Sequence, residues 1–161
     1  MILRRQRPVA FQRVGDRTLI RLEEEERLML VDLAGQFRSV VADDHDPGLR
    51  RLYPIAYPNN PDWDADYASL VHDDLVRLRL EAADTVEATA GSPSLADDEL
   101  ADWMQVLNGL RLLLGTRLDI SEEDQFDPEA DDAPARALLA WLGFLLEEAV
   151  VAAGEPDGTN A

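Results

Sequence analysis

The sequence predicts a mainly α fold: a bundle of about four long helices preceded by an N-terminal β-hairpin. Four long segments carry apolar residues every three or four positions, the spacing of one helix face. Residues 9–22 instead alternate apolar and polar side chains around a Gly-Asp pair, which is typical of a hairpin. The chain has 161 residues, 46% of them apolar, which is enough to form one domain with a substantial core.

The hairpin is predicted over residues 9–22. With a two-residue turn at Gly15-Asp16, Phe11 lies opposite Ile20 and Val14 opposite Arg17. Alternation then separates an apolar face from a polar one that carries Arg17 and Arg21, with Leu19 as its exception. The apolar face consists of Val9, Phe11, Ile20 and Leu22. An isolated hairpin is marginal in water, so this face must pack on helices or on another chain, and a homodimer stays open.

The four helices are expected at residues 23–42, 62–90, 95–118 and from near Pro134 to about 153. Their predicted core stripes are Leu30, Leu33, Ala34, Phe37 and Val41; Tyr67, Val71, Leu75, Leu78, Ala82 and Val86; Leu100, Trp103, Leu107, Leu110, Leu114 and Leu118; and Leu138, Trp141, Leu142, Leu145, Ala149 and Val150. A short helical turn is expected around residues 49–53. We therefore predict a single domain over residues 1–153 and a disordered tail at 154–161.

The composition excludes several kinds of chemistry. There is no cysteine, so disulfides, thiolate nucleophiles and zinc–thiolate sites are absent. All 15 basic residues are arginine, which excludes a P-loop lysine and a Schiff-base lysine. No signal-peptide pattern occurs at the N-terminus, and the uninterrupted apolar runs are short for a bilayer span. We therefore expect a cytoplasmic protein that does not enter a membrane.

The net charge of −18 is unevenly distributed. Residues 1–22 carry six arginines and one acid, a charge of +5, and the rest of the chain holds nine arginines and 32 acids, a charge of −23. So acidic a body repels phosphate backbones and anionic membranes. Nucleic-acid binding is therefore not expected, except through the basic N-terminal arm.

The sequence shows no catalytic or metal-binding pattern. The acidic loop after residue 118 fails as an EF-hand, because Asp124 stands where glycine is required and Ala130 where glutamate is required. His45 and His72 have no second histidine at ligand spacing. Neither a G-x-S-x-G, a G-x-G-x-x-G nor an H-E-x-x-H motif occurs. We predict no enzyme activity, no cofactor and no metal; a metal-dependent hydrolase built on His45 is the least supported alternative.

The third predicted helix has the most unusual polar residues. Asn108, Arg111 and Gly115 share one helix face beside the leucine stripe. Gly109 and Gly115 each cost about 1 kcal/mol relative to alanine, which indicates that a neighbour approaches the backbone closely. Arginine beside an apolar face often pairs with carboxylates. A structural ion-pair network is the favoured interpretation of Arg111, and an anion or partner site is the alternative.

Residues 103–118, WMQVLNGLRLLLGTRL, resemble the pattern W…LN-x-LR-x-x-LGTRL of an uncharacterised actinobacterial family, the domain of unknown function numbered two thousand and seventeen. The hairpin, residues 51–57 and the segment around Trp141 are similar to it as well, so the likeness covers about residues 9–152. Gly109 departs from the pattern, which usually has an acid there. The resemblance implies a small protein without established enzymatic activity. It also implies a link to Clp proteolysis or stress, because genes of this family often neighbour that of the Clp adaptor.

We therefore expect a non-enzymatic, regulatory protein-binding module of the bacterial cytoplasm. The alternative is a transcription regulator that contacts DNA through the basic hairpin arm, a role also suggested within the family that the chain resembles. We expect a protein partner to bind either the acidic helical body or the face of the hairpin. The candidate partner-binding residues are Asn108, Arg111, Thr116, Arg117, Arg17 and Arg21.

Overall fold

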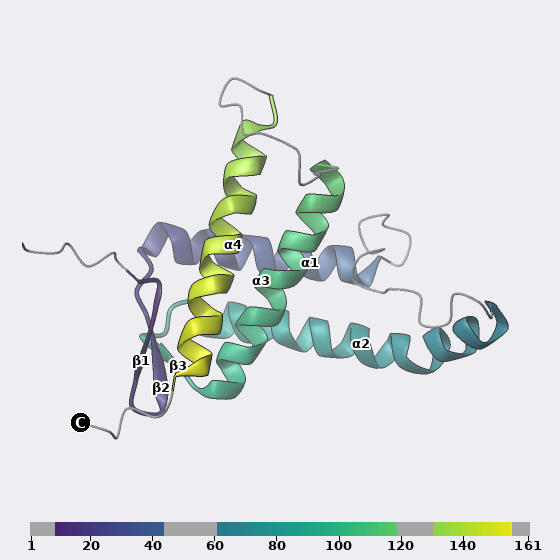
Figure 1. Ribbon diagram of the computed structural model, residues 1–161, viewed down its shortest axis with the longest axis horizontal. Coiled ribbons are helices and arrows are strands. Elements are labelled where there is room, and N and C mark those ends of the chain that lie inside the picture. Colours follow the sequence, from purple (N-terminus) through teal and green to yellow (C-terminus); the bar gives the residue numbers. More distant parts are fainter. Residues whose placement is uncertain (1–8, 44–60, 119–130, 156–161) are drawn as a thin grey trace, which may run out of the picture.

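The fold consists of two antiparallel helix pairs that lie across each other, with a small sheet at one side (Figure 1). The computed structural model describes residues 9–43, 61–118 and 131–155, except for the side chains of residues 61–70. Within these residues, α1 (Glu24–Ala42) pairs with α2 (Pro61–Thr89), and α3 (Asp97–Leu118) pairs with α4 (Ala133–Gly154). The mainly α class, with four long helices after an N-terminal hairpin, is confirmed.

The hairpin forms in the predicted register. Strand β1 (Phe11–Val14) pairs with β2 (Arg17–Ile20), with Phe11 opposite Ile20 and Val14 opposite Arg17. Gly15 at the turn has φ 63°, a left-handed conformation that glycine adopts without a steric penalty. The pairing and the turn residue therefore agree with what the Gly-Asp pair predicts.

A third strand, β3 (Ser94–Leu95), extends this sheet and was not predicted. Leu95 was expected to begin the third helix, which is wrong: its backbone pairs with Thr18 and its side chain is fully buried. The helix begins at Asp97. Just before it, the Ala96 N–H donates a hydrogen bond to Glu99 Oε1 at 2.8 Å. The acids of the first turn then face the positive end of the helix dipole.

The apolar face of the hairpin is covered within the same chain. Phe11 and Ile20 are buried, and the Phe11 ring packs edge-on against Trp103 with 5.8 Å between centroids. Trp103 is itself fully buried, and its Nε1 donates to Thr89 Oγ1 at 2.7 Å. This one side chain therefore joins the hairpin, α2 and α3, and the hairpin needs no second chain to bury Phe11 and Ile20.

Arg27 fastens the end of the hairpin to the connection between α2 and β3. Its guanidinium donates to four backbone carbonyl oxygens, at distances of 2.7–3.0 Å. These acceptors belong to Ile20, Leu22, Ala90 and Ser92. Carbonyls that do not belong to a ladder need such donors, so this arginine acts as part of the fold. The sequence analysis assigned no role to it.

The first two helices match their predicted stripes in part. All five stripe residues of α1 are buried. In α2, Ala82 and Val86 are buried, but Leu78 is 44% exposed, so its assignment to the core is wrong. The reason is that α2 extends beyond the helices that cover its C-terminal half (Figure 1). Tyr67 lies among the side chains outside the described residues.

The other two stripes also need correction. On α3, Leu114 and Leu118 are only half-buried, because the buried surface runs instead through Val106 and Leu113, where α1 and α2 cover a second side. On α4, Leu142, Leu145 and Ala149 are buried as predicted. Val150 is 50% exposed, and its assignment to the core is wrong.

Several predictions fall outside the described residues. They are the helical turn at 49–53, most of the acidic loop, and all but the start of the predicted tail. The last helix includes Gly154, and Pro134 stands in its first turn as expected.

Candidate functional site

The crossing of α1 over α3 explains one of the two helical glycines. A Cβ at Gly109 would lie 2.5 Å from Cε2 of Phe37, closer than non-bonded carbon atoms approach. The prediction of a close neighbour is therefore confirmed at Gly109, and the neighbour is an aromatic ring. An acid at this position, usual in the family pattern, could not fit beside Phe37 as the ring stands.

Asn108 and Arg111 both lie toward α4. Asn108 lines an open groove along the seam of α3 and α4, and Arg111 lies close to Gly143, where a Cβ would be 3.5 Å from its Nε. We call this hollow the α3–α4 groove. Its lining residues are Ala101, Asp102, Met104, Gln105, Asn108, Leu146 and Val150.

The α3–α4 groove combines an apolar surface with negative charge. Met104, Leu146 and Val150 supply aliphatic side chains. Asp102 is the one charged lining residue, and its Oδ2 accepts a 2.7 Å hydrogen bond from Thr85 Oγ1. Glu147 is exposed on α4, three residues before Val150 and therefore its neighbour on the helix surface. No arginine among the described residues forms an ion pair with either acid.

Among the described residues, the favoured interpretation of Arg111, a structural ion-pair network, is not found. Within residues 9–43, 71–118 and 131–155, its half-buried guanidinium has neither a carboxylate within 4.0 Å nor a hydrogen-bond acceptor. Its Nε lies beside Gly143, where a Cβ would make an ordinary van der Waals contact at 3.5 Å. Arg111 therefore places a positive charge next to the α3–α4 seam, and no carboxylate of the described residues pairs with it.

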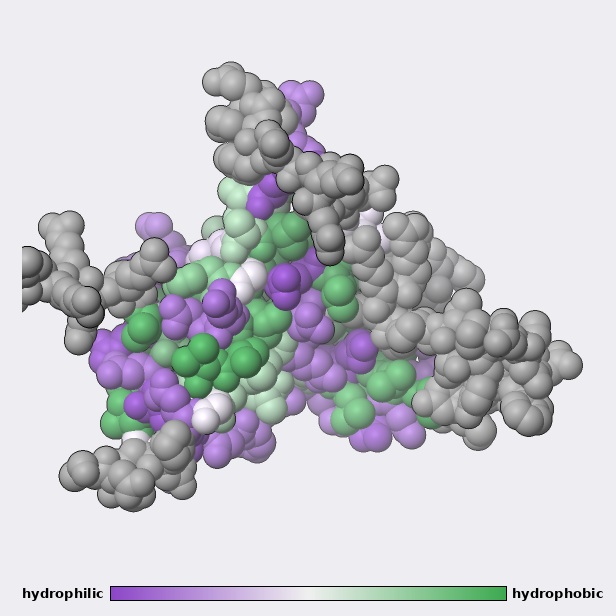
Figure 2. Space-filling model, in the orientation of Figure 1, coloured by the Kyte–Doolittle hydropathy of each residue, from purple (hydrophilic) through white to green (hydrophobic). Residues whose placement is uncertain are grey.

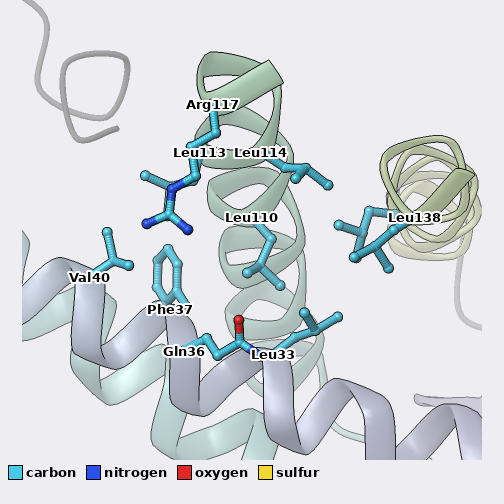
Figure 3. Close-up of a pocket in the computed structure, with 10 residues that line it drawn as sticks. Leu33, Gln36, Phe37, Val40, Leu110, Leu113, Leu114, Arg117 and Leu138 are labelled. Carbon is cyan, nitrogen blue, oxygen red and sulfur yellow. The ribbon is translucent and has the colours of Figure 1, made fainter. Parts of the chain in front are cut away.

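Thr116 and Arg117 are separated from Asn108 and Arg111. Thr116 is 9% exposed, and its hydroxyl donates to the Leu112 carbonyl at 2.8 Å within the helix. Arg117 reaches from α3 toward α1 at the edge of a pocket between α1, α3 and α4 (Figure 3). The rest of that pocket is lined by Leu33, Gln36, Phe37, Val40, Leu110, Leu113, Leu114, Leu138 and Leu142.

The size of this pocket argues against a small-molecule site. Its volume is about 90 Å³. An engineered apolar cavity that binds benzene has about 150 Å³, and drug-sized ligands occupy several hundred Å³. The pocket is therefore best described as imperfect packing where three helices meet.

The hairpin arginines bind their own chain. Arg17 donates through Nε to Ser94 Oγ at 2.7 Å and lies 3.7 Å from Glu99, and Arg21 donates to Gln12 Oε1 at 2.6 Å. Arg13, on the inward side of the hairpin, forms an ion pair with Asp97. Arg17 and Arg21 therefore lie apart from Asn108 and Arg111, and apart from Thr116 and Arg117.

A different ion-pair network, which the sequence analysis did not predict, occurs between α1 and α2. Arg38 pairs with Asp84 and, at 2.7 Å, with Glu87. The hydrogen bond to Glu87 is the main reason why the pKa of Arg38 is raised above its ordinary value, with the contacts to Asp84 adding to it and desolvation opposing it. No sequence spacing indicated this pairing.

The outward face of α4 is apolar and open. Phe144 is 42% exposed, Val150 50% and Val151 56%. Figure 2 shows hydrophobic side chains gathered over this helix. Ala137 and Ala140 continue the same exposed side, and Glu147 is its main charge. We call Phe144, Glu147, Val150 and Val151 together with the α3–α4 groove the α4 face.

By length and composition α4 could also cross a membrane. It has 22 residues, and they include an 18-residue stretch with a mean hydropathy of 1.7, of which 22% is buried. The absence of a membrane interaction stays a prediction.

Metal ligation finds no support in the part of the chain that the structure describes. No group of three or more His, Asp or Glu side chains there is placed to hold a metal ion. His72 is half-buried and has a partner, while His45 and the acidic loop lie outside the described residues.

The comparison with protein families gives one match. The profile described as "Domain of unknown function (DUF2017)" matches residues 7–153. No curated protein and no solved structure matches the chain. The match covers most of the sequence, including the hairpin, all four helices and the α4 face.

Proposed function

The chain belongs to the DUF2017 family, and because that family is one of unknown function, we propose a function from its surface: a non-catalytic, regulatory protein-binding module that docks a partner on its α4 face. The observation that carries the proposal is the exposed apolar side of α4. Large exposed apolar patches with a polar rim are typical of protein interaction sites. Here the polar groups are Asp102 and Asn108 in the groove and Glu147 on α4 between Phe144 and Val151.

The arrangement of the face supports a role in binding. Phe144, Val150 and Val151 lie within two turns of one helix, so one partner element can contact all three. Gln105 and Asn108 add amide groups that can donate and accept hydrogen bonds along the groove. Aliphatic and aromatic anchors beside polar groups form the usual composition of a docking surface.

Affinity enrichment from lysate of the source organism tests this role. The bait is compared with its Val150→Asn variant and with Leu78→Asn, which removes a similarly exposed apolar side chain on α2. We expect a defined set of proteins that wild type and Leu78→Asn retain and that Val150→Asn loses. Retention of the same proteins by all three baits would contradict the proposal.

A further inference from the structure

We infer that the occupant of the α4 face is a basic amphipathic helix of a protein partner. This inference rests on the proposed docking function and adds the chemistry of the partner. It follows from three properties of the face: its length, its apolar surface and its unneutralised acids.

The length of the groove fits a short helix. Its α3 wall runs from Ala101 to Asn108, two turns or about 10 Å. On α4, Phe144 to Val151 covers an equal distance on the antiparallel neighbour. A groove between two antiparallel helices accepts a third helix whose apolar residues recur at i, i+3/i+4 and i+7. Two to three turns of partner helix therefore suffice to cover it.

The negative charge of the face favours a partner that carries positive charge. Asp102 keeps one carboxylate oxygen beyond its bond from Thr85, and Glu147 stands exposed beside Val150. Since neither acid forms an ion pair with an arginine of the described residues, an arriving Lys or Arg would find both charges available. The net charge of −18 adds a long-range field that speeds the approach of a cationic segment.

The same charges disfavour the two other occupants of an apolar face. A second copy would bring its own Glu147 and another −18 to the contact, and like charges oppose association. An anionic membrane surface would be repelled in the same way. Arg111 lies beside Gly143 on α4 and supplies a positive group there, which can bind a carboxylate or a helix C-terminus of the partner.

A displayed library of 18-residue helical peptides tests the inference. Peptides with randomised surface positions are selected on wild-type protein and counter-selected on Val150→Asn. We expect the enriched peptides to carry a net positive charge opposite an apolar stripe. Enrichment of acidic or uncharged peptides, or no enrichment, would overturn the inference. In either case, partners lost by Val150→Asn in lysate would leave the docking function standing.

The best enriched peptide then measures the two contributions separately by fluorescence anisotropy. Val150→Asn should weaken its binding about tenfold or more, since loss of a central apolar contact dominates small interfaces. Glu147→Arg should weaken it roughly three- to tenfold, and less at high salt, because reversal removes one attraction and adds one repulsion. Leu78→Asn and Asp73→Arg make matched changes on α2 and should bind as wild type does.

Two measurements decide against the alternative occupants. Sedimentation of the protein alone at micromolar concentration should show no dimer that depends on Val150, that is, none that the Val150→Asn substitution dissociates. Flotation with phosphatidylcholine vesicles, with and without phosphatidylglycerol, should leave the protein unbound. A dimer or a vesicle complex that depends on Val150 would overturn the basic-helix inference and assign the face to that occupant.

Discussion

The two long helices α2 and α4 protect their outward faces in opposite ways. α2 carries ten charged residues among 29, and its exposed side holds ion pairs such as Arg77 with Asp74 and Glu81. α4 carries three among 22, and its exposed side is largely aliphatic and aromatic. Both helices pack one side on α3. A surface helix needs only one apolar stripe to fold, so the second apolar side of α4 is in excess of what folding requires.

The difference shows that exposed apolar residues are isolated among charged residues on α2 but adjoin one another on α4. Leu78 on α2 and Phe144 on α4 are almost equally exposed, at 44% and 42%. Leu78 stands among charged neighbours, and such single apolar residues are normal on a surface. Phe144 belongs to a continuous apolar side. The relevant property is thus the extent of the patch, and not the exposure of any one residue.

Replacement of Trp103, which joins the hairpin, α2 and α3, should have the largest effect. Trp103→Ala removes the contact with Phe11 and the bond to Thr89, and we expect a loss of about 3–5 kcal/mol in the free energy of unfolding. Urea denaturation followed by circular dichroism measures it. Trp103→Phe keeps most of the burial and should lose clearly less; equal losses in the two variants would contradict this role of Trp103 packing.

Gly109→Ala should have the next largest effect, because its new methyl group meets the Phe37 ring. Overpacking of this kind costs about 1–3 kcal/mol in unfolding free energy. Gly91→Ala is the control, since nothing lies within 4 Å of its Cβ position. A double variant with Phe37→Leu should recover part of the loss, and strict additivity of the two changes would show that the ring is not the cause.

Arg38→Ala should destabilise the α1–α2 pair by only about 0.2–1 kcal/mol, since its partners are partly exposed. A double-mutant cycle with Glu87→Ala isolates the pair. The coupling should shrink in 1 M salt, because screening weakens exposed ion pairs. If salt leaves the coupling energy unchanged, the stabilisation by Arg38 comes from packing of its aliphatic chain and not from its charge.

Val150→Asn and Leu78→Asn should have the smallest effects on folding. Both side chains are about half exposed, and surface replacements usually change stability by less than about 0.5 kcal/mol. Thermal denaturation should therefore give nearly equal melting temperatures for the two variants and wild type. A large loss for Val150→Asn alone would show that the α4 face is needed for the fold, which would undermine its assignment to a partner.

Sequence patterns predicted the buried side of α1 completely and that of α4 except for Val150, for a physical reason. In α1 the five predicted residues recur at helical spacing and all are buried, although Leu28 and Met29 on the same helix are 62% and 48% exposed. In α4 nearly every side is apolar, and periodicity cannot choose between Leu145, which is buried, and Val150, which is not. β3 was not predicted because a strand of two residues is too short to show an alternating pattern.

The candidate site was predictable to the extent that it depends on one helix. Asn108 and Arg111 were placed on one face by their spacing, and both lie toward α4. Arg117 was grouped with them, but the crossing of α1 puts it at a different hollow. The pairing of Arg38 with residues 46 and 49 positions away depends wholly on how two helices pack, which no local pattern contains.

The most direct test of the docking role is photo-cross-linking in cells of the source organism, from position 144 on α4 and from position 78 on α2. Because the two side chains are almost equally exposed, unspecific collisions should label both positions alike. We predict discrete cross-linked products with another protein from position 144, reduced by Glu147→Arg, and none of these products from position 78. The same products from both positions, or none from position 144, would contradict a partner on the α4 face.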